Sequence, residues 1–450
     1  MAKPVAALPI AVLIEVIAAR AAMTAVALAT VARGGIADCS QFLTDLRITQ
    51  LDSGLTVATE HVPGALSVAT GVWVGVGSRD EPPELSGVSH FLEHLLFKGT
   101  PTRTSQEISR SVDRVGGDFN AFTAKEYTAY YCRLPARHAE FCVDLLGDVL
   151  IRPALRETDV DSERLVILEE LAMDDDSPDD VAHRMFAAQL FAEHPLGRET
   201  AGDRDTVQAI NAGDVRRFFE SHYHAGSMVV TLAGPIDHDV ALQLISSAFA
   251  GVRPSGEMVS RTPPLSRGGD DTVDDDTEQV HIVMGSRSLA RGDDDREALD
   301  VVNHVFGGGL SSRLFEEIRE RRGLAYSVYS GVSAYTDAGA FQMYAGTQPE
   351  HGPEVVGLMR SELDRLVREG VTDDELDVAV GYLTGAFELG LEDTGARMAR
   401  NGGQLITTGT IRPIDEQVAR WAAVDQAAVK RTIDRVFTEP PITVTVGPTP

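Results

Sequence analysis

The chain is 450 residues long and carries 40 Lys and Arg against 68 Asp and Glu, which gives a formal net charge of −28. With 43% hydrophobic and 24% charged residues it has the composition of a folded globular protein. The acidity argues against nucleic acid or an anionic membrane as a main partner. Three cysteines without CxxC spacing exclude a disulfide framework and a thiolate zinc site, which favours a reducing, cytoplasmic location.

Residues 1–44 form an N-terminal extension ahead of the first regular pattern. They are rich in Ala and Val, but Glu15 and Arg20 interrupt the apolar stretch. No uninterrupted piece reaches the roughly 18–20 residues that a membrane span needs. Two interpretations stay open: a dispensable extension, or a targeting segment that would direct export, for which Pro9 and Glu15 are poorly suited. We expect no stable membrane span.

The first predicted domain, residues 45–250, mixes strands and helices. Two short strands around a tight turn at 52–54 open it. The β-branched run 67–77 predicts a buried strand, and a helix is expected from 85 to 97, with Gly99 just beyond its end. Further helices are expected at 104–115, 138–150, 159–175 and 178–191, and further strands at 118–133 and 227–234.

Residues 251–277 are rich in Gly, Pro, Ser and Asp and have no apolar period, which predicts a linker. The second predicted domain follows at 278–450. Its expected elements are a strand at 279–286, helices at 293–306 and 311–322, strands at 324–333 and 339–347, helices to about 436 and a last strand at 442–446. The sequence therefore predicts an α+β fold with two similarly ordered mixed α/β-sheet domains.

The segment HFLEH at residues 90–94 carries the strongest functional signal. On the predicted helix His90 and His94 are i and i+4, so both imidazoles project from one face, and Glu93 stands on the same side. Chance would produce this spacing about 0.02 times in such a chain. A helix whose polar face happens to carry these residues is the structural alternative. The surrounding residues are apolar, however, and buried polar groups need partners, so we expect zinc.

A catalytic zinc usually has three protein ligands and one open position, so a third ligand must come from another element. The predicted helix at 159–174 offers Glu163, Glu169 and Glu170. Glu163 and Glu170 share a face one heptad apart, whereas Glu169 is rotated by about 100° from Glu170. Spacing alone leaves the third ligand undecided.

With HFLEH the sequence resembles the inverzincins, the pitrilysin/insulysin family of zinc metallopeptidases. It is most similar to the short bacterial members and to mitochondrial processing peptidase, and the likeness spans about residues 45–445. The resemblance implies a processing-peptidase-like fold and one zinc ion per chain. It also implies Glu170 as the third zinc ligand beside His90 and His94, and Glu163 as a residue that supports the site.

Two further segments resemble functional parts of that family. The stretch GGDFNAFTAKEYTAYY resembles its substrate-binding edge strand, which implies that Asn120, Ala121 and Phe122 pair with a peptide backbone. The stretch SRLFEEIRERRGLAYSV resembles the segment that reaches the active site from the second domain, which implies Arg319 and Tyr326 as donors to the developing oxyanion. The second domain has no HxxEH, so we expect it to hold no zinc, and the resemblance implies that it closes over the substrate.

The resemblance implies a zinc-dependent metalloendopeptidase that hydrolyses peptides or unfolded segments, with Glu93 as general base, and a homodimer. The alternative is a non-catalytic family member acting as a scaffold or partner subunit. Such members typically lose zinc ligands or the base, whereas this chain keeps His90, Glu93, His94 and Glu170. A metal-binding regulator without hydrolysis is a third interpretation, in which Glu93→Gln would leave function intact.

Overall fold

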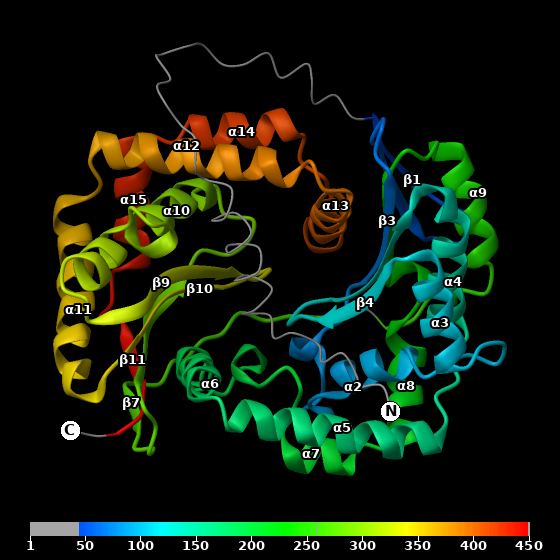
Figure 1. The fold of residues 1–450 in the computed structure, drawn as a ribbon, viewed down its shortest axis with the longest axis horizontal. Coiled ribbons are helices and arrows are strands. Elements are labelled where there is room, and N and C mark those ends of the chain that lie inside the picture. The colour runs from blue at the N-terminus through cyan, green and yellow to red at the C-terminus, as the bar shows by residue number, and fades with distance from the viewer. Residues whose placement is uncertain (1–44, 258, 449–450) are drawn as a thin grey trace. The chain divides into compact units, whose positions relative to one another are not determined.

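The computed structural model describes residues 45–257 and 259–448, so the predicted extension at 1–44 and Cys39 lie outside the described residues. Two mixed β-sheets with helices packed on them form the α+β fold that the sequence predicts (Figure 1). Both sheets belong to one unit, Thr44–Pro450. None of the helices in the described ranges is long and apolar enough to cross a bilayer.

The first sheet has six strands in the order β1-β2-β6-β3-β5-β4, in which only β2 and β6 run parallel. Its strands are β1 Asp45–Gln50, β2 Thr56–His61, β3 Ser67–Val74, β4 Asp118–Thr123, β5 Thr128–Pro135 and β6 Met228–Gly234. The β-branched run predicted to be buried is β3, which lies between β6 and β5 and is buried from its second residue onward. The strand β4 lies at the edge of the sheet.

Helices of the first half pack on one face of this sheet and enclose its main core. They are α2 Val88–Leu96, α3 Ser105–Val115, α4 Ala139–Ile151, α5 Glu157–Asp175, α7 Arg204–Ala209, α8 Ala212–His222 and α9 His238–Ala248. The helix α2 carries HFLEH, and its apolar residues Phe91, Leu92 and Leu95 are fully buried. Burial of these three side chains fixes which face of α2 presents the histidines.

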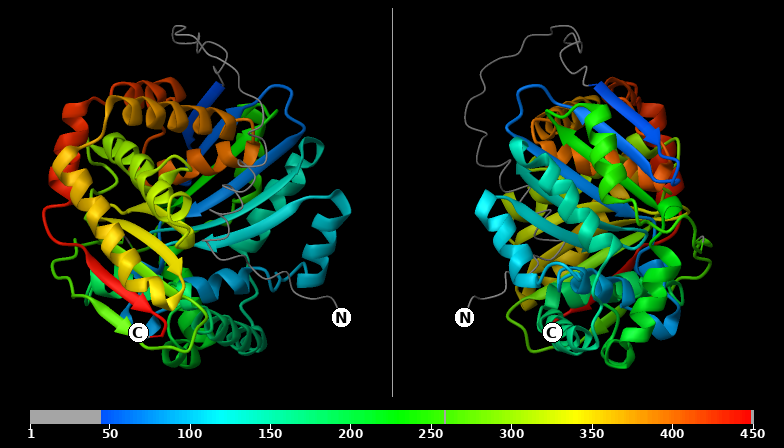
Figure 2. Two further views of the ribbon diagram at one scale, coloured as in Figure 1. Left: turned by 60° about the vertical axis from the view of Figure 1, so that its left-hand side comes forward. Right: turned by 90° about the vertical axis from the view of Figure 1, so that its right-hand side faces the viewer.

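The second sheet has five strands in the order β7-β11-β8-β10-β9. They are β7 Asp271–Val273, β8 Val280–Ser288, β9 Ala325–Ala334, β10 Gly339–Thr347 and β11 Ile442–Val446. The helices of this half are α10 Arg296–Asn303, α11 Gly352–Glu369, α12 Asp373–Gly390, α13 Thr394–Thr408, α14 Ile414–Ala422 and α15 Gln426–Val436. Among them α10, α11 and α15 contact the second sheet, which Figure 2 shows in two further orientations.

Each half sends one helix to the sheet of the other half. The helix α13 from the second half lies against the first sheet, where Met398 and Leu405 join a buried cluster with Trp73. The helix α6, Pro178–Leu190, follows α5 directly and packs on the second sheet, where Phe186 is buried near Val283. Because α5 leads straight into α6, contacts with the second sheet help to fix the end of α5.

A buried ionic network also joins the halves at the turn between β4 and β5. The carboxylate of Glu126 in this turn accepts hydrogen bonds from Arg79 at 2.7 Å, Arg291 at 2.8 Å and the backbone N–H of Thr336 at 2.9 Å. The side chains of Arg79 and Glu126 are only 2% and 1% exposed. Buried charges tolerate this environment only when they are paired and hydrogen-bonded. The network therefore ties the end of β4 to the second half.

Several predicted elements differ in detail from the structure. The stretch 118–133, predicted as strand, is the hairpin β4–β5, with a turn at 124–127. Residues 271–273 of the expected linker form β7, which pairs with β11. The helices predicted at 293–306 and 311–322 include π-helical turns at His304–Gly308 and Phe315–Glu320. Apolar periodicity does not reveal these turns, because each widens the helix from i→i+4 to i→i+5 hydrogen bonding over only 5 or 6 residues.

Candidate active site

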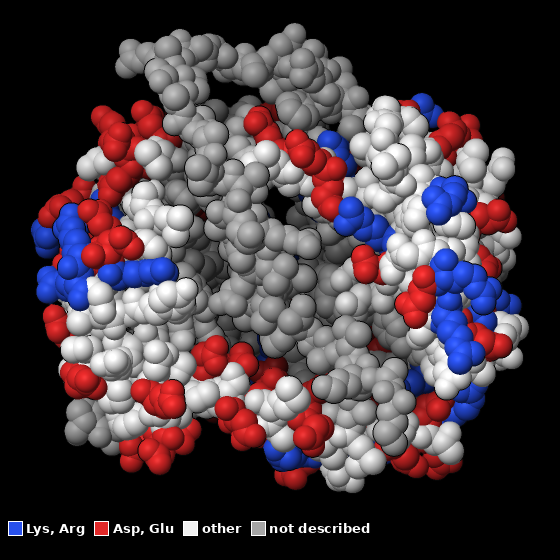
Figure 3. Space-filling model, viewed as in Figure 1, with Lys and Arg blue, Asp and Glu red and all other residues white. Residues whose placement is uncertain are grey.

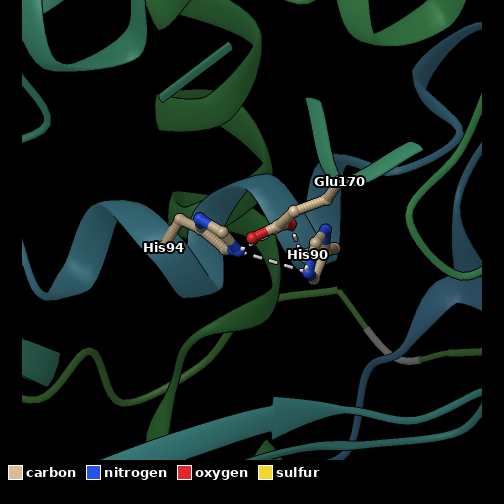
Figure 4. A group of neighbouring side chains, drawn as sticks. All are labelled: His90, His94 and Glu170. Carbon is tan, nitrogen blue, oxygen red and sulfur yellow. Dashed lines mark hydrogen bonds and ion pairs between the residues drawn. The ribbon is translucent and has the colours of Figure 1, made fainter. Parts of the chain in front are cut away.

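The helices α2 and α5 bring the two histidines of HFLEH and one glutamate together (Figure 4). The Nε2 atoms of His90 and His94 lie 3.3 Å apart. From α5, Glu170 Oε2 lies 3.5 Å from His94 Nε2 and 3.9 Å from His90 Nε2. These three residues offer donor atoms within 4.8 Å of one another, and they are the only such His, Cys, Asp or Glu group that the described residues contain.

The structure distinguishes the three glutamates of α5 between which helical spacing could not choose a third metal ligand. Glu163 and Glu170 both face the histidines from α5, at His94 Nδ1 and at the two Nε2 atoms respectively. Glu169 is exposed and, among the described residues, forms no hydrogen bond or ion pair with either imidazole. Of the three, Glu170 alone converges on the same point as both Nε2 atoms.

Glu163 fixes the orientation of the His94 ring. Its Oε2 lies 3.2 Å from His94 Nδ1, and its Oε1 pairs with the ammonium of Lys98. Burial opposes ionisation of Glu163, but the hydrogen bonds from His94 and Lys98 outweigh burial and hold its pKa below the ordinary value. An ionised Glu163 accepts the Nδ1–H of His94, which directs His94 Nε2 toward Glu170.

The charges around the two rings suit a cation between them. Burial, reinforced by nearby His94, lowers the pKa of His90 to about 3, so this ring is neutral at pH 7. Burial works in the same direction on His94, but Glu163, Glu170 and Glu93 outweigh it and raise its pKa. Two imidazole nitrogens and a carboxylate oxygen are the ligands of a common class of catalytic zinc site. The donor set and the surrounding negative charge therefore fit a zinc ion.

Glu93 lies beside this group without belonging to it. Its side chain is 8% exposed, and the hydroxyl of Thr123 on β4 donates a hydrogen bond to its Oε2. Burial raises its pKa to about 6, against the effect of the Thr123 hydrogen bond. The other oxygen, Oε1, has no protein partner among the described contacts. A carboxylate with a raised pKa and one free oxygen is suited to exchange a proton near neutral pH.

The residues predicted to bind substrate lie on β4, whose outer edge pairs with no other strand of the described chain. Ala121 is buried in the core beside α2, whereas Asn120 is exposed on the opposite face. The ring of Phe122 packs edge-on against Trp73 at 5.9 Å, on the side where α13 lies. An edge strand next to a catalytic centre offers unpaired backbone groups to an extended peptide.

Arg319 and Tyr326 contact each other in the second half. Arg319 Nη1 donates to the carbonyl of Tyr326 at 2.9 Å, and its guanidinium lies 4.5 Å from the centre of the Tyr326 ring. The Tyr326 side chain is 79% exposed. Within the described chain neither residue forms a hydrogen bond or ion pair with His90, His94 or Glu170. The structure thus brings Arg319 and Tyr326 together but does not join them to the group formed by His90, His94 and Glu170.

Sequence reasoning missed two residues of this site. Lys98 follows His94 by one helical turn and pairs with Glu163, and Thr123 holds Glu93. The i+4 spacing of Lys98 from His94 was a usable signal for the first. Nothing in the sequence places Thr123 against α2, because that contact depends on how the sheet and the helix pack.

Two family models match consecutive segments of the chain. Residues 56–204 match the family model described as insulinase (peptidase family M16), and residues 209–383 match that of the peptidase M16 inactive domain. The only metal-type group among the described residues lies in the first matched segment. The strand β6 falls within the second match although it completes the first sheet.

Bacterial relatives match along most of their length. The chain is 42% identical over 411 residues to an uncharacterized zinc protease of Streptomyces coelicolor, covering 90% of each chain. It is 41% identical to an uncharacterized zinc protease of Mycobacterium tuberculosis, covering 85% of this chain and 88% of that one. A Bacillus subtilis protein with the same description, YmxG, is 36% identical, with 86% and 94% covered.

Two solved structures share the fold. One, described as a peptidase M16 inactive domain from Pseudomonas fluorescens, has a TM-score of 0.85 at 19% identity and covers 90% of this chain and 98% of that one. The other, a protease from Helicobacter pylori, has a TM-score of 0.83 at 24% identity and covers 90% and 100%. At these identities the two structures show that the fold is shared.

Proposed function

Because this chain belongs to the insulinase (peptidase M16) family, we propose that it is a zinc-dependent metalloendopeptidase. One zinc ion per chain would be held by His90, His94 and Glu170. The observation that carries this proposal is the convergence of two imidazoles and a carboxylate from separate helices within 4.8 Å, with a buried carboxylate beside them. Such a ligand set leaves an open position, as catalytic zinc sites do.

Zinc bound in this site would supply Lewis acidity, which makes water a nucleophile near neutral pH and polarises a carbonyl. The residues of the chain do the remaining work. Glu93 accepts the proton of the attacking water at its free Oε1 and returns it to the nitrogen of the leaving amine. Thr123 holds the other oxygen of Glu93 in place. Glu163, neutralised in part by Lys98, keeps His94 oriented toward Glu170.

The substrate proposed for this site is an extended peptide or an unfolded segment. It would add to the free edge of β4 along Asn120, Ala121 and Phe122, where backbone pairing gives affinity with little demand on side chains. Arg319 and Tyr326 are proposed to donate hydrogen bonds to the carbonyl oxygen as negative charge develops on it. Their mutual contact supports a shared role, since Arg319 holds the Tyr326 backbone.

The same proposal extends to the assembly and location of the protein. By resemblance to short family members we propose a homodimer, and by its few cysteines a cytoplasmic protein. Figure 3 shows acidic side chains spread across the viewed face, in keeping with the net charge of −28. The retained His90, Glu93, His94 and Glu170 favour a catalytic role over that of a scaffold or partner subunit.

Metal removal tests this proposal directly. We expect purified protein to cleave members of a quenched-fluorescence peptide library, to lose this activity after dialysis against a chelator, and to regain it when one equivalent of zinc is added. The physical reason is that no other group in the site can polarise the scissile carbonyl as strongly. Mass spectrometry of the native protein counts the bound metal in parallel. Hydrolysis that persists at full rate in demonstrably metal-free protein would contradict the proposal.

A further inference from the structure

The N-terminus of the zinc-site helix α2 is capped by a buried glutamate from outside the helix. Glu81 Oε2 accepts the backbone N–H of Gly87 at 2.7 Å, and Glu81 Oε1 accepts that of Ser89 at 2.7 Å. Glu81 is 3% exposed. The first N–H groups of a helix have no partner within the helix, so a buried helix start needs acceptors from elsewhere.

The N-cap residue of α2 has no side chain that could accept these backbone N–H groups. It is Gly87, with φ +94°, and a Cβ atom there would come within 2.4 Å of the Ala201 carbonyl oxygen. The next residue of that segment, Gly202, is equally confined, since a Cβ on it would lie 2.3 Å from the Ser86 carbonyl oxygen and 2.9 Å from the Gly87 Cα. A side chain of the usual capping kind, such as Ser or Asp, has no room at this position. The capping role therefore falls to Glu81.

The two histidine ligands are anchored in different ways. His94 is oriented by Glu163 through its Nδ1. The Nδ1 atom of His90 is buried and has no hydrogen-bond partner in the described structure. His90 directly follows Ser89, whose N–H is bound by Glu81. Because no residue holds the ring through Nδ1, as Glu163 holds that of His94, the direction of the His90 ring depends on the conformation of the first turn of α2.

We infer that Glu81 is a positioning residue for the zinc ligand His90, acting through the backbone of the first turn of α2. This inference rests on the proposed zinc site. The two oxygens of one carboxylate bind two N–H groups of the turn that carries His90, so Glu81 acts through the backbone, whereas Glu163 contacts the His94 ring itself. Outer partners of this kind typically change metal affinity 10–100-fold when they are lost.

Glu81→Gln tests this role. A glutamine keeps the size of the side chain but has one acceptor oxygen, and its NH₂ group would face the second backbone N–H. Glu107→Gln is the matched control, because Glu107 caps α3 through the N–H and hydroxyl of Thr104 at 2.8 and 2.9 Å. The measurements are the zinc Kd by chelator competition and the visible spectrum of the cobalt-substituted protein, which reports the ligand geometry.

We expect Glu81→Gln to raise the zinc Kd about 10–100-fold and to change the cobalt spectrum, and Glu107→Gln to change neither. A purely structural role would lower the unfolding temperature of both variants without moving these readouts. If Glu81→Gln does not unfold cooperatively, Glu81→Asp, which keeps both oxygens on a shorter arm, is measured in its place. A wild-type Kd and spectrum in the variant that folds would overturn the inference. Failure of the wild type to bind zinc would instead refute the proposed function.

Discussion

Replacing Glu93 with glutamine is expected to lower kcat on a cleavable peptide by about 10²–10⁴-fold while the zinc stays bound. An amide cannot accept the proton of the attacking water, yet it has the size of the carboxylate and an oxygen for the Thr123 hydroxyl. Glu93 does not belong to the group of converging metal donors, so its loss should leave them in place. The measurement pairs steady-state kinetics with the metal content of the same sample.

The control for this variant is Glu84→Gln, the same change at an exposed glutamate ahead of α2. It should retain wild-type kcat and wild-type zinc. An unchanged kcat in Glu93→Gln would refute the general-base role. Loss of zinc from Glu93→Gln would show instead that Glu93 is itself a ligand.

Glu170→Gln is expected to weaken zinc binding by more than about 100-fold, since even outer partners of a zinc site cost 10–100-fold when removed. The neighbouring Glu169→Gln is the matched control, because both variants remove one negative charge from the same stretch of α5. Only Glu170 reaches the imidazoles, at 3.5 and 3.9 Å, whereas Glu169 is exposed. Chelator competition with both proteins separates the ligand from the general charge of the helix.

Equal zinc Kd values for Glu169→Gln and Glu170→Gln would contradict the ligand assignment. A larger loss in Glu169→Gln would mean that α5 turns the other face toward α2. Peptidase activity should follow zinc occupancy in both variants, so adding zinc above the raised Kd should restore part of the activity of Glu170→Gln.

The sequence predicted the local part of this site and left the long-range part open. The pair His90 and His94 could be placed on one helical face because i, i+4 geometry depends only on the helix. The choice between Glu163, Glu169 and Glu170 could not be made by spacing, because it depends on how α5 packs against α2. Only the family resemblance selected Glu170, which lies beside the two Nε2 atoms in the structure and is proposed as the third ligand.

The same distinction applies to the fold. The buried strand β3 and the helix α2 were readable from hydrophobic patterns. These patterns did not predict that α13 packs on the first sheet and α6 on the second, because each arrangement depends on contacts between residues far apart in the chain. The strand β7 was not predicted from the sequence for a related reason. It has three residues in a Gly- and Asp-rich stretch, and pairing with β11 rather than its own pattern makes it a strand.

X-ray absorption at the zinc edge tests the central claim most directly, because it reads the atoms around the metal in the native protein. For protein loaded with one equivalent of zinc, the account predicts a first shell of nitrogen and oxygen only, at about 2.0–2.2 Å, with the outer-shell scattering of two imidazole rings. The imidazole signal should fall to one ring in His90→Ala. A shell without imidazole scattering, or one containing sulfur, would contradict the assignment of His90, His94 and Glu170 as the zinc ligands.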